Sequence, residues 1–315
     1  MNRIASVHGE IMENIYANLG LSYQEVELLE KYKLTYLLDK IQEQQHQLAE
    51  HEKQLEKALS KIEKDLNAAR EAQMNLLPKE LLGVPQIEFK ARFHPSLYVS
   101  GDTYNVFRLD ENHIGVYHID IAGHGVPAAL FSVSLSQLLN TNISRKNLLK
   151  VPVTEPPYYK INPPNKVIEM LNEDHSFERN GIYFTMLYMI IDMRENKVTY
   201  TRAGHNPPIL IRKNGQVEMY DEGGFPVGWD FPRNDSVVEL SVSSGDRLFM
   251  YSDGITEATD AGEHLFGNER LVQILSEEKG STLDQTLDKV ITRLREFTGK
   301  VAFQDDVSIL GLAWK

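Results

Sequence analysis

The sequence predicts an α+β fold, in which two antiparallel β-sheets pack as a sandwich and are flanked by helices, with an N-terminal helical extension. Three observations support this prediction. From residue 86 onwards, short alternating or apolar segments recur between turn residues, and pairs of helical segments are inserted among them. Before residue 78, by contrast, apolar residues follow a heptad spacing. We therefore expect a helical coiled-coil segment over residues 1–77 and a folded domain over residues 78–315.

The composition narrows the class of protein. The chain has 315 residues, of which 42% are hydrophobic, and this is enough for a substantial core. Its formal net charge of −12 argues against binding to nucleic acid or to an anionic membrane, because both need a basic surface. No apolar stretch reaches the roughly 18 residues of a membrane span and the N-terminus lacks a signal-peptide pattern, so we expect a cytoplasmic protein. There are no cysteines, and any metal must therefore be held by oxygen or imidazole ligands.

The N-terminal segment has the pattern of a coiled coil. Its main apolar row recurs every seven residues, at Leu34, Ile41, Leu48, Leu55, Ile62 and Ala69. The remaining faces are rich in Glu, Gln and Lys, which favours a homodimer through this helix over the alternative of a single amphipathic helix docked on the next domain. Gln45 and Glu52 lie in the second row of the seam and weaken it. We therefore hypothesise that the helix is a switchable connector rather than a permanent rod.

Pro78, Gly83 and Pro85 mark the boundary to the folded domain. Beyond it, strands are expected at residues 86–93, 103–109, 113–121, 182–191, 197–203, 208–212, 217–220, 236–242, 246–251 and 307–313. Helices are expected at residues 126–139, 165–177, 268–277 and 283–297. Residues 140–165 contain five prolines and are expected to form an irregular surface excursion.

Aspartates adjoin apolar strands at four places in the folded domain, each beside a glycine or a second acid. These places are Asp102, Asp120, Asp253 and the pair Asp305-Asp306. Taken singly, each is explained as a turn residue or a helix cap. If the strands bring them to one edge of the sheets, however, the crowded carboxylates need a compensating cation. An all-oxygen cluster suits Mg²⁺ or Mn²⁺, and two such ions can hold a hydroxide and a phosphoryl oxygen for hydrolysis of a phosphate ester.

Five motifs in order carry a family resemblance. They are Ser100-Gly101-Asp102, Asp120-Ile121-Ala122-Gly123-His124-Gly125, Ala203-Gly204-His205-Asn206-Pro207, Ser252-Asp253-Gly254 and Asp305-Asp306-Val307-Ser308. Together they resemble the SpoIIE/RsbU-like branch of the PPM (protein phosphatase 2C-like) serine/threonine phosphatases, over about residues 70–315. The resemblance implies a β-sandwich flanked by helices, two Mn²⁺ or Mg²⁺ ions, and hydrolysis of phosphoserine or phosphothreonine on a small protein, such as a STAS-domain anti-sigma-factor antagonist.

The resemblance also implies roles for individual residues. Asp120 would bridge both ions, and the carbonyl group of Ile121 would help to hold them. Asp253 and Asp305 would complete one metal position. Asp102 would lie in the shell of the other ion.

Four further residues need separate interpretation. His124 is the candidate general acid, although a simple role in the turn explains it on the residues alone. Asn105 stands where the family carries an acid, which predicts weaker binding of one ion. Arg92 is the nearest candidate for the phosphate-binding arginine of the wider family, but it is better explained as an exposed strand arginine. His205 is expected to stabilise a turn together with Asn206.

The sequence thus favours a metal-dependent phosphatase whose N-terminal helix dimerises and conveys a signal from an upstream regulatory protein. The signal would act through residues 70–82, so that Asp102 and Asp120 are or are not placed for metal binding. The alternative is a catalytically weak or inactive descendant that binds a phosphorylated partner or serves as a dimeric scaffold, with Asn105 as an early sign of metal loss. A nuclease using the same ions is disfavoured by the net charge of −12 and by the lack of a basic groove.

Overall fold

The computed structural model describes residues 18–20, 22–78, 81–123, 125–143, 147–299 and 302–315. Contacts divide the chain into two compact units, residues 1–65 and residues 66–315. The boundary falls within helix α2 (Tyr23–Leu76), so that about three turns at the end of this helix belong to the second unit.

Within the first unit, the described residues form the long helical part of α2. The helix begins earlier than the heptad pattern from Leu34 suggested, because Ser22 and Glu25 form a capping arrangement at its start. The backbone N–H and the hydroxyl of Ser22 both donate to the Glu25 carboxylate, at 2.7 and 2.6 Å. The heptad side chains, such as Leu48 and Leu55, are largely exposed. The predicted seam is therefore open to a partner, and dimerisation stays a prediction.

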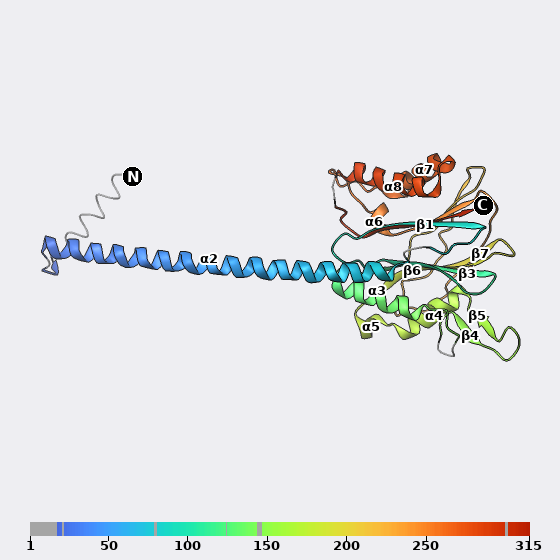
Figure 1. Cartoon of the computed structure of the whole chain (residues 1–315), viewed down its shortest axis with the longest axis horizontal. Coiled ribbons are helices and arrows are strands. Elements are labelled where there is room, and N and C mark those ends of the chain that lie inside the picture. Colours follow the sequence, from blue (N-terminus) through green and yellow to red (C-terminus); the bar gives the residue numbers. More distant parts are fainter. Residues whose placement is uncertain (1–17, 21, 79–80, 124, 144–146, 300–301) are drawn as a thin grey trace. The chain divides into compact units, whose positions relative to one another are not determined.

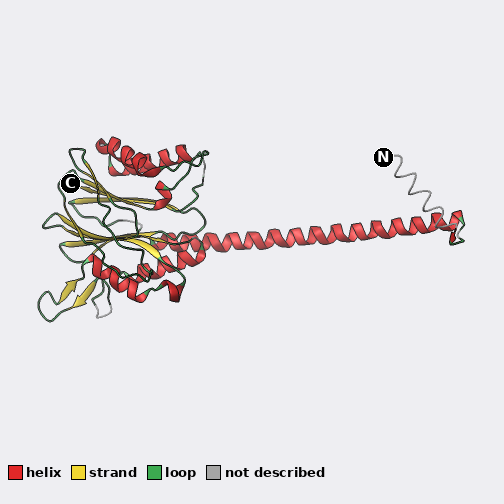
Figure 2. Cartoon of the chain, turned by 180° about the vertical axis from the view of Figure 1, so that it is seen from behind, coloured by secondary structure: helices red, strands yellow, loops and turns green. Residues whose placement is uncertain are grey.

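The second unit is a sandwich of two five-stranded antiparallel sheets (Figures 1 and 2). One sheet has the order β1-β12-β11-β8-β9, made of β1 (Ile87–His94), β12 (Val307–Trp314), β11 (Arg247–Tyr251), β8 (Ile209–Ile211) and β9 (Val217–Met219). The other has the order β10-β7-β6-β3-β2, made of β10 (Val238–Ser241), β7 (Lys197–Ala203), β6 (Phe184–Asp192), β3 (His113–Ile121) and β2 (Thr103–Arg108). The predicted α+β sandwich is confirmed.

Helices cover the outer face of each sheet. The main helices are α3 (Val126–Leu138), α4 (Pro164–Asp174), α7 (Gly267–Glu277) and α8 (Leu283–Thr298), and the short ones are α5 (Phe177–Asn180), α6 (Asp253–Thr256) and the 3₁₀ turn η1 (Glu278–Gly280). Helices α3 and α4 pack on the β3–β6 sheet, and α7 and α8 pack on the β11–β12 sheet. None of the helices in the described residues combines the length and the apolar character needed to cross a membrane.

Strand alternation separates the three apolar layers of this unit. On β3, Ile114 and Val116 belong to the core between the two sheets, whereas Tyr117 and Ile119 pack toward α3 and α4. The same alternation decides which polar side chains of β3 point into the sandwich.

Residues 140–165 contain more regular structure than the sequence predicted. Two short strands, β4 (Lys150–Pro152) and β5 (Tyr159–Ile161), form a small antiparallel hairpin there. Each strand is only three residues long, too short for an alternation pattern to stand out among the prolines.

Candidate functional site

Antiparallel pairing brings four of the predicted aspartates to one end of the sandwich. Asp102 precedes β2 and Asp120 lies near the end of β3, its neighbour in the sheet. In the other sheet, Asp253 follows β11 and Asp305 precedes β12, which are also neighbours. Because an antiparallel pair places the end of one strand beside the start of the next, each sheet contributes two carboxylates at this end.

The carboxylates are close enough to shift one another's pKa. Burial, together with the charges of Asp253 and Asp305, raises the pKa of Asp120 to about 8. Burial and the charge of Asp305 raise the pKa of Asp253 to about 6. The pKa of Asp102 is also raised, by burial and then by the charge of Asp120. Carboxylates that interact in this way are stabilised in their ionised form when a cation binds between them.

The chemistry of the cluster fits a hard divalent cation. Its side chains offer only carboxylate oxygens, the ligands preferred by Mg²⁺ and Mn²⁺. Asp102 is buried whereas Asp305 is exposed, so the cluster opens to solvent on one side. Across the part of the chain that the structure describes, no group of three or more His, Cys, Asp or Glu side chains forms a ready-made metal site. The fit therefore lies in the type of donor and the proximity of the acids, not in a closed ligand shell.

Asp306 holds the first motif in place, a role that the sequence did not reveal. Its carboxylate accepts hydrogen bonds from the backbone and hydroxyl of Ser96, at 2.8 and 3.0 Å. It also accepts from the hydroxyl of Ser100 at 2.6 Å and from the backbone N–H of Gly101 at 2.9 Å. Asp306 thereby fixes the loop that carries Asp102.

Two glycines allow the motifs to pack backbone against backbone. A Cβ atom added at Gly254 would lie 2.0 Å from the carbonyl oxygen of Asp306. A Cβ atom added at Gly101 would lie 3.0 Å from the carbonyl oxygen of Ile121, at the end of β3. Gly101 and Gly254 therefore permit close approach between segments from different strands.

Gln73, near the end of α2, joins the helix to the same loop. Its side-chain amide donates to the carbonyl of Ser100 at 2.6 Å and accepts from the backbone N–H of Ser100 at 3.0 Å. The amide also donates to the hydroxyl of Ser132 on α3 at 3.3 Å. Sequence reasoning missed this buried residue, although it continues the second heptad row seven positions after Leu66.

The interpretation of His205 as part of a turn pair with Asn206 was wrong. His205 is buried, and its Nε2 atom lies 2.9 Å from Nδ1 of His118. Its other ring nitrogen, Nδ1, lies 2.8 Å from the hydroxyl of Thr185. His205 therefore points into the sandwich, where strand alternation also places His118, two residues before Asp120.

Asn105 and Arg92 also differ from expectation. Asn105 lies opposite Tyr117, on the helix-facing side of β2, and its side chain accepts from the backbone N–H of Val106 at 2.8 Å. The side chain of Asn105, which stands where the family carries an acid, therefore does not lie at the carboxylate cluster. Arg92 is only partly exposed, because it forms ion pairs at 2.9 and 2.7 Å with two aspartates of α8. His124, the candidate general acid, lies outside the described residues.

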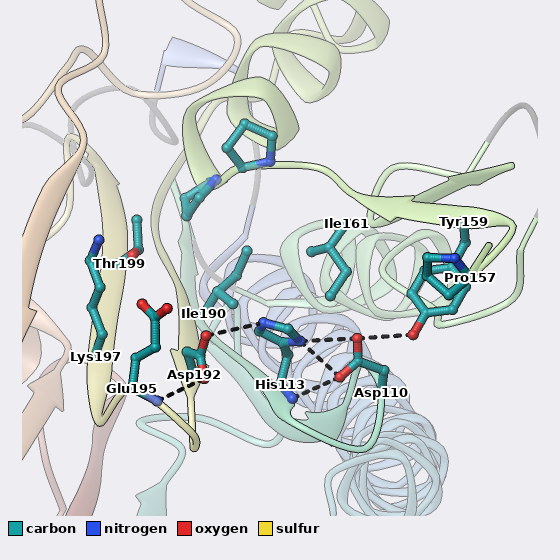
Figure 3. A pocket seen from close by; sticks show the side chains of 12 residues that line it. Asp110, His113, Pro157, Tyr159, Ile161, Ile190, Asp192, Glu195, Lys197 and Thr199 are labelled. Atoms are coloured by element: carbon teal, nitrogen blue, oxygen red, sulfur yellow. Dashed lines mark hydrogen bonds and ion pairs between the residues drawn. The ribbon is translucent and has the colours of Figure 1, made fainter. Parts of the chain in front are cut away.

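A cavity of about 410 Å³ lies elsewhere in the domain (Figure 3). His113, at the start of β3, contacts the carboxylates of Asp110 at 2.8 Å and Asp192 at 3.5 Å, and the hydroxyl of Tyr159 donates to Asp110 at 3.0 Å. His113 and Asp120 are seven positions apart on an extended strand, or roughly 24 Å. The cavity is therefore separate from the carboxylate cluster.

This sandwich, with helices on both outer faces, is the fold of the PP2C-type phosphatase domains. It is similar to the SiaA-PP2C domain of Pseudomonas aeruginosa, with a TM-score of 0.65 at 17% sequence identity, covering 82% of this chain and 99% of that domain. Residues 110–315 match the family described as Stage II sporulation protein E (SpoIIE). The chain belongs to the SpoIIE family, which confirms the resemblance seen in its motifs.

Two curated relatives come from Bacillus subtilis (strain 168). The chain is 25% identical over 236 residues to the phosphoserine phosphatase RsbP, covering 74% of this chain and 53% of RsbP. It is 25% identical over 269 residues to the phosphoserine phosphatase RsbU, covering 81% of this chain and 69% of RsbU. The chain thus spans about half the length of RsbP.

Proposed function

We propose that the chain is a metal-dependent protein phosphatase that hydrolyses phosphoserine or phosphothreonine. The observation that carries the proposal is the convergence of Asp102, Asp120, Asp253 and Asp305 at one end of the sandwich, where burial and mutual repulsion raise the pKa values of the first three. The similarity to two named phosphoserine phosphatases supports this class of reaction.

The proposed roles follow the positions of the residues. Asp120 and the carbonyl of Ile121 would hold both ions, Asp253 and Asp305 would hold one, and Asp102 would hold the other. Bound Mn²⁺ or Mg²⁺ would supply an activated water and neutralise charge on the phosphoryl group. His124 would donate a proton to the leaving serine or threonine oxygen.

The full chain should hydrolyse p-nitrophenyl phosphate and a phosphoserine peptide when Mn²⁺ is added. Asp120→Asn and Asp253→Asn should each lower the rate by on the order of 100-fold or more, because a lost ligand removes metal activation of water. Asp110→Asn, at the separate cavity of Figure 3, is the matched control and should keep the wild-type rate. Binding of the phosphopeptide without hydrolysis in Mn²⁺ would contradict the proposal and favour a binding or scaffold module.

The proposed substrate is a small phosphorylated protein of the STAS-domain type, as the family resemblance implies. Incubation with candidate phosphorylated STAS proteins should release phosphate in a Mn²⁺-dependent manner. The acidic chain, with its net charge of −12, would rely on the metal ions rather than on a basic surface to attract the phosphoryl group. Equal activity on every phosphopeptide tested would argue against a dedicated protein substrate.

Regulation is proposed to act through α2 under the control of an upstream protein. Gln73 holds both backbone groups of Ser100, so a shift at this end of the helix would move the loop that carries Asp102. Gln73→Leu should therefore weaken Mn²⁺ binding and lower the rate. Wild-type Mn²⁺ affinity in this variant would contradict the proposed link.

Homodimerisation through the heptad seam can be tested by crosslinking, because the chain has no native cysteine. Leu55→Cys should form a disulfide-linked dimer, since Leu55 lies in the main apolar row. Lys57→Cys, on the opposite face of the same helix turn, should not. Absence of a dimer with Leu55→Cys, in the presence and absence of substrate, would contradict the dimer.

A further inference from the structure

A chain of hydrogen bonds crosses the interior of the sandwich and ends on Asp102. The hydroxyl of Thr185 lies 2.8 Å from Nδ1 of His205, and Nε2 of His205 lies 2.9 Å from Nδ1 of His118. Nε2 of His118 then lies 3.0 Å from the hydroxyl oxygen of Ser308, and this hydroxyl donates to Oδ2 of Asp102. Thr185 and His118 lie on β6 and β3, whereas Ser308 lies on β12, so the chain links both sheets.

Two ring nitrogens face each other in this chain of hydrogen bonds, so one of them must donate and the other must accept. His118 and His205 are almost fully buried, at 0% and 2% exposure. Burial of this kind disfavours a charged imidazole, because a buried charge without an ionic partner is costly. A neutral imidazole has one N–H donor and one acceptor nitrogen. Each ring therefore passes a hydrogen bond in one direction only.

When a cation binds at the carboxylate cluster and Asp102 is ionised, Asp102 fixes that direction along the whole series of hydrogen bonds. The carboxylate can only accept, so the single hydroxyl proton of Ser308 points to Asp102. The Ser308 oxygen must then accept from Nε2–H of His118, which leaves Nδ1 of His118 to accept from Nε2–H of His205. Nδ1 of His205 accepts in turn from the hydroxyl of Thr185. Every donor points toward Asp102, and both histidines carry their proton on Nε2.

We propose that Ser308, His118 and His205 are positioning residues that hold Oδ2 of Asp102 and orient its carboxylate for the metal ion. The inference rests on the proposed function, since it needs a cation at the carboxylate cluster. The Ser308 hydroxyl holds Oδ2, and this fixes the rotation of the carboxylate and so the direction of its other oxygen. The two imidazoles add no positive charge that would compete with a cation, and they keep the hydroxyl from rotating away.

A further observation places the two ends of this series of hydrogen bonds at the same site. Thr185, where the series of hydrogen bonds starts, lies directly opposite Asp120 in the pairing of β3 and β6. The hydrogen bonds therefore run from the strand neighbour of one proposed ligand to the carboxylate of another. The ring of Tyr104 stacks on His118, with centroids 6.4 Å apart, and covers the link from the side.

The inference is tested by measuring Mn²⁺ binding to the full-length protein without substrate. The EPR signal of free Mn²⁺ reports how much of the ion is bound. His118→Leu should weaken binding by about 10–100-fold, the usual effect of losing a residue that supports a metal ligand. His118→Gln keeps a donor and an acceptor and should recover most of the affinity. Tyr188→Phe removes a buried β6 hydroxyl for which the described residues provide no partner, and it should bind Mn²⁺ like the wild type.

Proton placement gives a readout that a purely structural role would not move. In ¹⁵N NMR spectra of the Mg²⁺-loaded wild type, both His118 and His205 should carry their proton on Nε2 alone. Thermal unfolding in EDTA will show whether each variant folds. If His118→Leu does not fold, Thr185→Val removes only the first donor, and it should weaken Mn²⁺ binding and release His205 from its single tautomer.

The outcomes separate the inference from the proposed function. A wild type that binds no Mn²⁺ overturns both. A wild type that binds Mn²⁺ while folded His118→Leu binds it equally well overturns the inference alone. A proton on Nδ1 of His118 in the Mg²⁺-loaded protein also overturns the inference alone. So does a Thr185→Val variant that binds Mn²⁺ like the wild type and keeps the same histidine tautomers.

Discussion

Replacing Asp306 by alanine should destabilise the sandwich domain far more than replacing its neighbour Asp305. The Asp306 carboxylate accepts four hydrogen bonds from the loop before β2. Two of the donors belong to Ser96, which is partly exposed, so water can replace the carboxylate as their acceptor. The other two, the Ser100 hydroxyl and the Gly101 N–H, are buried and would be left without an acceptor.

The size of the effect follows from those two buried donors. A buried group left unsatisfied costs about 1–3 kcal/mol, so the pair costs about 4 kcal/mol in the free energy of unfolding. For a domain of this size, 1 kcal/mol corresponds to roughly 2–4 °C, which gives a fall in Tm of about 8–16 °C. Relief of the repulsion between Asp306 and Asp102 offsets part of this loss.

Thermal unfolding followed by circular dichroism measures the difference, with EDTA present so that metal binding adds no stability. Asp305→Ala is the matched control, because Asp305 is exposed and, among the described residues, accepts the backbone N–H of Asp306 at 2.7 Å and no other donor. Its Tm should not fall below that of the wild type by more than about 2 °C, and relief of the repulsion from Asp120 and Asp253 acts in the stabilising direction. If the two variants unfold at the same temperature, Asp306 does not anchor the loop and the reasoning is refuted.

Three further predictions follow from other contacts. The pKa of Asp120 is raised to about 8, so its contribution to the stability of the metal-free protein is greatest below about pH 4 and is lost as the pH rises to 8. Thermal melts in EDTA between pH 5 and 8.5 should show this loss of stability. Asp120→Asn should make the loss smaller. Arg92→Ala should lower the free energy of unfolding by about 1 kcal/mol in urea yet leave kcat unchanged, since the side chain braces α8; a large loss of kcat would show that it binds phosphate. Gly254→Ala should weaken Mn²⁺ binding, because its Cβ would lie 2.0 Å from the Asp306 carbonyl oxygen, whereas Gly280→Ala, with open space around it, should not; equal binding by both would contradict the close approach.

The sequence was sufficient for the strands of the two large sheets, though not for the β4–β5 hairpin, because the signals of the longer strands are local. Apolar and polar alternation, bounded by turn residues, located β3 and β7 at their observed limits. The four aspartate positions were found for the same reason, since each adjoins such a strand. Asp306 could not be assigned its role in this way, because its contact with Gly101 joins residues 205 positions apart. Only the packing of the two sheets decides which distant loops meet.

The positions of Asn105 and His205 were not predicted, for different reasons. Asn105 lies three residues after Asp102 in an extended strand, so alternation alone places the two side chains on opposite faces. The family motif gives the residue type at this position, whereas the strand period decides which face its side chain occupies. His205 stands between glycine and asparagine, a local pattern that reads equally well as an exposed turn. Its burial depends on a partner, His118, that is 87 residues away.

The hydrogen-bond donors around each acid separate structural carboxylates from candidate metal ligands. An oxygen already filled by N–H or O–H donors has little capacity left for a cation. Asp306 receives four such donors, all from the loop it anchors. Within the described part of the chain, Asp305 accepts from one backbone N–H, that of Asp306, and its side chain is exposed. We therefore expect Asp305→Asn to weaken Mn²⁺ binding directly, whereas Asp306→Asn would do so only by loosening the Asp102 loop, an effect that should appear together with a lower Tm.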